Sequence, residues 1–99
     1  MTRIRVEGRG AGEDAARLLR TAIESKVRRL RLAIEATEAR LRAFELRYGR
    51  TSDEAMATAT AEDLIGGDLE YVEWLGEWRM LRQLRGDLGQ LEAIEYADR

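Results

Sequence analysis

The sequence predicts an all-α fold, a long antiparallel helical hairpin with a short connecting helix at its tip. Proline is absent from all 99 residues, so no helix is broken from within. Apolar residues recur every three or four positions along two long stretches, which is the period of one face of an α-helix. Glycines at Gly49 and at Gly66-Gly67 interrupt these stretches and mark the place where the chain turns back.

The first twelve residues predict an N-terminal arm. Ile4 and Val6 alternate with charged residues, which is the pattern of a short strand, and three glycines at alternate positions follow as a flexible joint. Because no second strand is predicted, the arm is expected to pair with a symmetry mate or another protein, or to be disordered. The chain is therefore divided into an arm, 1–12, and a helical hairpin domain, 13–99.

The stretch from Glu13 to about Tyr48 predicts one long helix. Its apolar positions are spaced as a heptad seam in which Thr37 fills a missing position. At 1.5 Å per residue this helix would be roughly 50 Å long, so it needs a second helix of similar length to cover the seam. The seam consists of Ile23, Val27, Leu30, Ile34, Leu41, Phe44 and Tyr48.

The connector carries helix-stop and helix-start signals. Gly49 is expected to end the first helix in a left-handed conformation, because it follows the last apolar position. Ser52 is expected to cap a short helix extending over Ala55–Leu64. Leu64 and Ile65 are expected to plug the end of the hairpin.

A second long helix is predicted from about Asp68, its N-cap, to Tyr96. Three interior glycines each cost up to ~1 kcal/mol, which indicates either close approach of another element or simple tolerance. The glycines are Gly76, Gly86 and Gly89. The apolar stripe consists of Tyr71, Trp74, Leu75, Trp78, Leu81, Leu84, Leu88, Leu91 and Ile94.

Charge is divided between the two halves of the chain. Residues 1–50 hold 13 basic and 7 acidic side chains, and residues 51–99 hold 4 basic and 12 acidic ones. Either two antiparallel helices complement each other, or the chain presents a basic and an acidic surface to different partners.

Composition excludes several kinds of site. The chain contains neither cysteine nor histidine, so thiolate metal sites and imidazole bases are ruled out. We expect no enzymatic activity, no cofactor and no metal. No apolar run approaches the ~20 residues that span a bilayer, and the charged start lacks the apolar core of a secretory signal. A cytoplasmic location without membrane contact is expected.

Two charged patterns offer alternatives. The pairs Glu70/Glu73 and Glu92/Glu95 resemble the Mg²⁺-binding carboxylates of all-α nucleotide hydrolases. They lie on one predicted helix, so only an antiparallel dimer would bring them together.

A basic cluster could contact nucleic-acid phosphates. An ordinary exposed face is favoured, and nucleic acid is an unlikely partner. The cluster consists of Lys26, Arg28, Arg29 and Arg31.

The apolar positions also predict an interface. One hairpin leaves part of each stripe exposed, so two copies are expected to pack as a homodimeric four-helix bundle. Aromatic residues such as Trp74 and Trp78 are most often core, and they are also common interface anchors. The predicted protein-interface residues are Ile4, Val6, Ile23, Val27, Leu30, Ile34, Leu41, Phe44, Tyr71, Trp74, Trp78 and Leu81.

The run from Phe44 to Trp74 resembles a family of small prokaryotic helical-hairpin proteins. Its members end a long charged helix with an F-E-x-R-Y-G step, and a G-D-x-E-Y-x-E-W motif opens their second helix. The Ala/Thr-rich segment Ala55–Ala61 and a shortened acidic loop depart from that pattern. The matching residues are Phe44, Glu45, Arg47, Tyr48, Gly49, Thr51, Gly67, Asp68, Glu70, Tyr71, Glu73 and Trp74.

The resemblance implies a function that neither composition nor spacing provides. Members of the family are similar to antitoxins, the non-catalytic partners that bind and neutralise small toxins, often nucleases. The chain would then be the antitoxin-like component of a toxin–antitoxin pair. The alternatives are a self-associating structural helical protein without a toxin partner and a Mg²⁺-dependent all-α nucleotide hydrolase.

Overall fold

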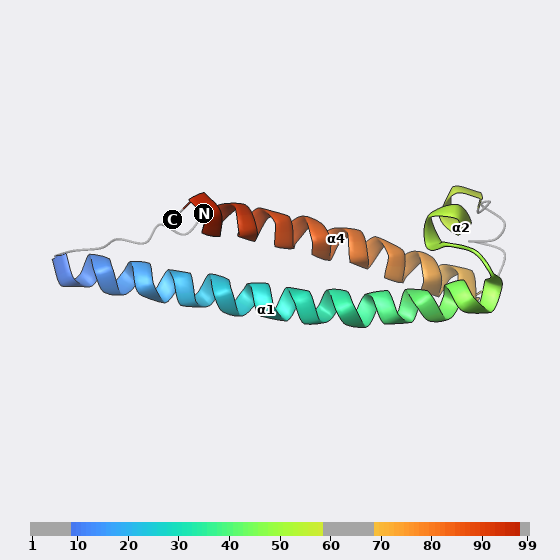
Figure 1. The fold of residues 1–99 in the computed structure, drawn as a ribbon, viewed down its shortest axis with the longest axis horizontal. Helices are drawn as coiled ribbons and strands as arrows, with labels where there is room; N and C mark the ends of the chain where they lie inside the picture. Colours follow the sequence, from blue (N-terminus) through green and yellow to red (C-terminus); the bar gives the residue numbers. More distant parts are fainter. Residues whose placement is uncertain (1–8, 59–68, 98–99) are drawn as a thin grey trace.

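The computed structural model describes residues 9–58 and 69–97, and it confirms the helical hairpin (Figure 1). Helix α1 spans Arg9–Tyr48, the short helix α2 spans Ser52–Thr58, and helix α4 spans Leu69–Ala97. The two long helices run antiparallel side by side, and α2 lies across one end of the pair. The chain is accordingly elongated, with extents of 60 × 25 × 19 Å.

The two ends of α1 compare differently with the prediction. The helix begins at Arg9, four residues before the expected Glu13, so Gly10 and Gly12 are helical and form no joint. It ends at Tyr48 as predicted, and Gly49 has a φ of +64°. The N–H of Arg50 donates to the carbonyl of Glu45 over 3.2 Å, which is the closing bond of a Schellman motif.

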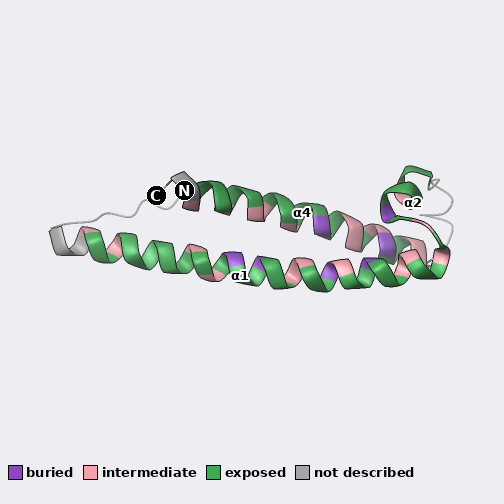
Figure 2. Cartoon of the chain, viewed as in Figure 1, coloured by how far each residue is buried: buried purple, intermediate pink, exposed green. Residues whose placement is uncertain are grey.

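The predicted seam forms the core between α1 and α4. Its most buried members lie on the facing sides of the two helices, as the purple segments of Figure 2 show. Thr37 is only 1% exposed, although it is polar. Its hydroxyl donates to the carbonyl of Ala33 over 2.8 Å and accepts from Arg40 over 3.2 Å. The buried hydroxyl at this polar seam position therefore finds its hydrogen-bond partners within α1.

Ion pairs fix the register of the hairpin. The pairs are exposed, so each contributes only about 0–1 kcal/mol and acts more on register than on stability. Three of them place an arginine of α1 on a glutamate of α4, which supports charge complementarity between the two helices. The pairs are Arg31–Glu92 at 3.0 Å, Arg40–Glu77 at 2.9 Å, Arg47–Glu70 at 2.7 Å and Arg85–Glu38 at 3.1 Å.

The two long helices differ in length, so α1 extends beyond α4. Helix α1 has 40 residues and α4 has 29. Since Arg31 lies beside Glu92, the first turns of α1 reach past the end of α4 (Figure 1). Leu18 and Leu19 in this overhang are 63% and 45% exposed.

The three glycines inside α4 have open space around them. A β-carbon built on Gly76, Gly86 or Gly89 would meet no heavy atom within 4 Å. Of the two interpretations of these glycines, close approach of another element is therefore not found among residues 9–58 and 69–97.

Several sequence predictions fall on residues outside those described. These are the strand at Ile4 and Val6, the N-cap Asp68, and the plug formed by Leu64 and Ile65.

Candidate functional site

Four aromatic rings pack together at the hairpin tip, where the ends of α1 and α4 lie beside α2. Phe44 and Tyr48 from α1 stack against Trp74 from α4, with ring centroids 5.6 and 5.4 Å apart. Tyr71 lies 5.8 Å from the Trp74 ring and 5.7 Å from that of Tyr48. Trp74 is fully buried and is the largest side chain of the core. Stacked pairs of this kind add ~0.5–1.5 kcal/mol beyond the burial of their area.

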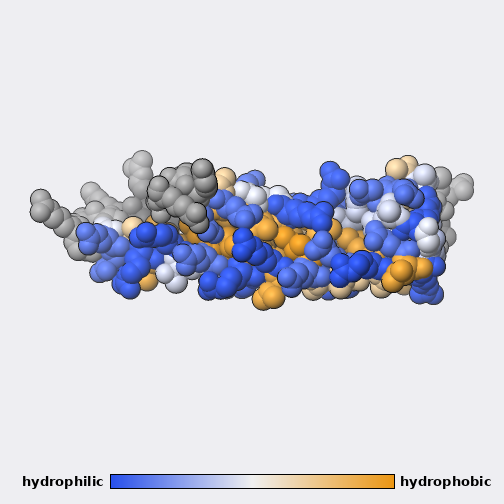
Figure 3. Space-filling model, viewed as in Figure 1, coloured by the Kyte–Doolittle hydropathy of each residue, from blue (hydrophilic) through white to orange (hydrophobic). Residues whose placement is uncertain are grey.

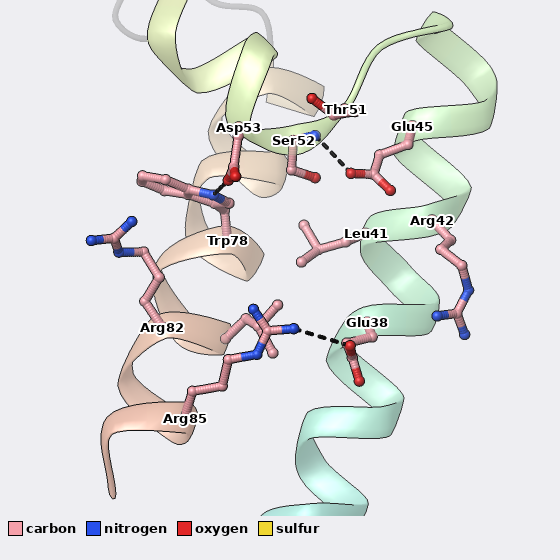
Figure 4. A pocket seen from close by; sticks show the side chains of 11 residues that line it. Glu38, Leu41, Arg42, Glu45, Thr51, Ser52, Asp53, Trp78, Arg82 and Arg85 are labelled. Carbon is pink, nitrogen blue, oxygen red and sulfur yellow. Dashed lines mark hydrogen bonds and ion pairs between the residues drawn. The ribbon is translucent and has the colours of Figure 1, made fainter. Parts of the chain in front are cut away.

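Helix α2 is pinned to this cluster by polar bonds from its first turn. The indole N–H of Trp74 donates to the hydroxyl of Ser52 over 2.8 Å. The indole N–H of Trp78 donates to Asp53 Oδ1 over 2.8 Å, and the backbone N–H of Ser52 donates to Glu45 Oε2 over 2.6 Å (Figure 4). The start of α2 is thus held by α1 and α4 together.

The cap of α2 differs from the prediction, which assigned it to Ser52. The backbone N–H of Glu54 donates to the hydroxyl of Thr51 over 3.1 Å, so Thr51 is the N-cap. Thr51 and Glu54 have the T-x-x-E spacing of a capping box, the signal that would have located it. Ser52 lies one position inside the helix and is 5% exposed, and its hydroxyl serves Trp74 instead.

Several described residues that carry the family resemblance lie at this tip, whereas Gly67 and Asp68 are outside the described residues. Glu70, at the start of α4, accepts a hydrogen bond from the Tyr48 hydroxyl and pairs with Arg47. Gly49 ends α1 and turns the chain, and Thr51 caps α2. Trp74 stacks on Phe44 and Tyr48 of α1 and donates a hydrogen bond to Ser52 of α2. The contacts of Tyr48, Glu70 and Trp74 are therefore structural, because they join α1, α2 and α4 at the tip.

A polar cleft of about 390 Å³ opens on one side of the tip (Figure 4). Its carboxylates are engaged: Glu38 pairs with Arg85, Glu45 accepts from Ser52, and Asp53 accepts from Trp78. The guanidinium of Arg82 lies 4.8 Å from the centre of the Trp78 ring, in cation–π geometry. Because these three carboxylates are already bonded within the chain, the cleft is mainly part of the fold, and Arg42 on its wall has no ion pair among the described residues.

A mainly apolar groove of about 500 Å³ lies along the boundary between α1 and α4. Ala43 and Phe44 form one wall, and Gly76 and Met80 form the other. Arg40, Glu73 and Glu77 line its rim. Figure 3 shows apolar atoms gathered where the two long helices meet, on a surface that is otherwise mostly hydrophilic.

The predicted interface residues are largely used inside the chain. Five of them are buried in the intramolecular core: Val27, Leu30, Leu41, Trp74 and Leu81. Four others pack against that core: Ile34, Phe44, Tyr71 and Trp78. Ile23 is partly buried. Contact between these residues and a second chain stays a prediction.

Seven of the eight large apolar residues left exposed were missed by the sequence reasoning, and the eighth, Ile94, was predicted in the α4 stripe but is 51% exposed. Four of them lie on α1 and four on α4, and their exposed fractions range from 42% to 85%. They are Leu18, Leu19, Leu32, Leu46, Leu69, Val72, Met80 and Ile94. At the edge of α1 that faces away from α4, apolar atoms project from the surface (Figure 3).

The residues of the alternative sites are distributed as follows. The four carboxylates proposed for Mg²⁺ all lie on α4, where Glu70 is tied to Arg47 and Glu92 to Arg31. Within residues 9–58 and 69–97, no three acidic side chains gather in a way that could hold a metal ion.

All four members of the basic cluster are exposed on α1. Arg31 pairs with Glu92 on α4.

No described helix has the length and apolar character needed to cross a bilayer. Compared with protein-family models, curated proteins and solved structures, the chain gives no match.

Proposed function

We propose that this chain is a non-catalytic protein-interaction module, the antitoxin-like component that binds and neutralises a small toxin. The observation that carries the proposal is the large amount of apolar side chain exposed outside the core. Leu32 is 65% exposed, Leu46 85%, Leu69 67% and Met80 49%, all in helices whose inner faces are already covered. Where exposed apolar residues form a contiguous patch, they commonly mark a protein-binding site.

The construction of the tip supports the same proposal. The three described helices are held together by the stack around Trp74 and by the hydrogen bonds that Trp74 donates to Ser52 and Tyr48 donates to Glu70. Such a scaffold presents two helix faces in a fixed relation, which lowers the entropy cost of binding. The antitoxin role itself rests on the family resemblance of the tip residues.

The proposal is tested by co-expressing the chain with the protein encoded next to it. Growth arrest by that neighbour alone, relieved when the chain is co-expressed, is the expected result. Val72→Glu and Met80→Glu place charges on the exposed face of α4 and should weaken relief, whereas Gln83→Glu is the matched control. A neighbouring protein that does not arrest growth would count against the role. Growth arrest that co-expression of the chain does not relieve would also count against it.

The N-terminal arm is proposed as a second contact with the toxin. Ile4 and Val6 have the alternation of a strand that adds to the edge of a partner's sheet. Removing residues 1–8, which precede α1, should leave helicity unchanged and weaken toxin binding. Full affinity after truncation would show that the arm is a mere tail.

A second candidate function is self-association, which the apolar groove favours. Two copies could lay their Ala43, Phe44, Gly76 and Met80 faces together as a homodimeric four-helix bundle. Sedimentation at micromolar concentration should then give a dimer mass, and Gly76→Trp should alter it. A monomer would exclude this assembly. A dimer whose genetic neighbour is harmless would favour a structural protein.

A third reading is the Mg²⁺-dependent hydrolase, whose carboxylates would have to be shared between two copies. A Mg²⁺ titration followed by calorimetry tests it, and saturable binding abolished by Glu73→Gln would support it.

A further inference from the structure

Helix α1 carries a second heptad seam on the side that faces away from α4. Leucine, serine or alanine recurs every seventh residue at Leu18, Ser25, Leu32, Ala39 and Leu46. The three leucines are 63%, 65% and 85% exposed. Four further positions fall between them at the complementary spacing, and three of these are exposed alanines. They are Ala22, Arg29, Ala36 and Ala43, and Ala43 lies at the edge of the seam, where it also lines the groove between α1 and α4. These nine residues are called the outer seam.

The period of the outer seam points to a helix as its occupant. Leu32 and Leu41 are nine residues apart, which is about 180° around a helix of 3.6 residues per turn. The outer seam therefore lies roughly opposite the buried core. A strict seven-residue repeat matches the 3.5-residue period at which two helices stay in contact. From Leu18 to Leu46 the seam is about 42 Å long. Its alanines leave room for close approach of a second backbone.

The charges beside the outer seam indicate the charge of the partner that would fit it. Lys26, Arg28, Arg29 and Arg42 are exposed in or beside it. In the part of the chain that the structure describes, no carboxylate lies within ion-pair distance of these four. The positions that flank the seam are 19, 26, 33, 40 and 47 on one side and 21, 28, 35 and 42 on the other, and Glu35 is the one acidic residue among them. The flanks of the seam are therefore positive.

A second copy of this chain fits the seam poorly. If two α1 helices packed through their outer seams, the positive flanks would face each other, and like charges across an interface are unfavourable. If α1 packed instead on the outer face of α4 from another copy, the two surfaces would lie on opposite sides of the hairpin. Such a contact is heterologous, so it would build a ring or an open filament of copies instead of a two-fold dimer.

We propose that the outer seam binds one amphipathic helix of a different protein, with leucine and alanine along its own seam and acidic side chains beside it. The inference rests on the proposed function and specifies the chemistry of the partner. Leu32, at the middle of the seam, would pack as a knob between residues of the incoming helix. Lys26, Arg28 and Arg42 would face its carboxylates.

A synthetic helix tests the proposal without knowledge of the native partner. The probe is a 28-residue peptide with leucine and alanine at the heptad core and glutamate at the flanking positions, and a matched peptide carries lysine there. Self-repulsion between glutamates keeps the probe from pairing with itself. We expect saturable binding by calorimetry, at least ten-fold tighter for the glutamate peptide and weaker as salt is raised.

Two variants locate the binding. Leu32→Lys should weaken binding of the glutamate peptide at least ten-fold. The helical circular dichroism should stay unchanged, because the Leu32 side chain is 65% exposed. Ile94→Lys, at a 51% exposed position on α4, is the control and should bind normally. Equal binding of both peptides, no binding, or equal effects of both variants would overturn the proposal.

Other occupants give other outcomes. A self-associated mass that Leu32→Lys reduces would assign the seam to a second copy and overturn the inference. A single-stranded RNA oligomer that displaces the peptide would assign the positive flanks to nucleic-acid phosphates, and it would also overturn the inference. A native toxin bound equally by Leu32→Lys would overturn the seam and leave the proposed function standing. Peptide binding without any toxin neutralisation would overturn only the proposed function.

Discussion

Replacing glycine by alanine should change the stability of this protein in opposite directions at Gly49 and at Gly86. Gly49 has a φ of +64°, and no atom lies within 4 Å of a β-carbon placed there. The cost is therefore that of the backbone alone, about 1–2 kcal/mol for an L-residue in the left-handed region. Gly86 lies inside α4 with equally open surroundings. Alanine there gains about 0.8–1.0 kcal/mol of helix propensity.

The two variants should thus differ by about 2–3 kcal/mol in the free energy of unfolding, for the same chemical change. Urea denaturation followed by circular dichroism measures it. The protein concentration must be held constant, because any self-association would add a mass-action term. In thermal unfolding, 1 kcal/mol corresponds to about 4–8 °C for a domain of 60–100 residues. Gly49→Asn should cost less than Gly49→Ala, since asparagine tolerates the left-handed region.

Two outcomes would refute this reasoning. If Gly49→Ala were neutral, the Schellman turn between Glu45 and Arg50 would not depend on a left-handed residue. If Gly86→Ala were destabilising, a β-carbon there would meet something other than residues 9–58 and 69–97. The second result would show that another molecule, or an undescribed segment of this chain, covers this part of α4.

Further predictions concern the tip. Ser52→Ala should cost about 1–3 kcal/mol, since it leaves the buried indole N–H of Trp74 without an acceptor. In a double-mutant cycle with Trp74→Phe, measured in urea, additive effects would contradict that bond. Thr51→Ala should cost about 1 kcal/mol through loss of the α2 cap, and Ser52 should not replace it. Trp74→Ala should cost about 3–5 kcal/mol, and an unchanged melting temperature would rule out its place in the core.

Much of the hairpin could be predicted because its signals are local and repeat along the chain. The seam from Val27 to Leu41 repeats often enough to define a helix and its inner face. Gly49 was correctly assigned because a glycine directly after the last apolar position has few other roles. The start of α1 was placed too late, at Glu13. Gly10 and Gly12 disfavour a helix by propensity, and propensity is a weak prior where one long helix continues.

The candidate sites were harder to predict, for two physical reasons. A buried serine and a capping serine look alike in a sequence, so Ser52 was given the cap that Thr51 provides. The outer seam was missed because Ser25 and Arg29 interrupt it and the stronger inner seam dominates the period. Only the position of α4 shows that Leu32 and Leu46 face outward.

The two seams of α1 give this helix a central place in the proposed assembly. One side is covered by α4, and the ion pairs of Arg31, Arg40 and Arg47 lie along that contact. The other side is apolar at its centre and positive at its edges. The aromatic cluster around Trp74 fixes α4 at the tip, so the inner contact forms with the fold itself. The outer seam contributes nothing to that core, since its leucines are exposed. Binding there can therefore be lost without unfolding, which separates recognition from stability along a single helix.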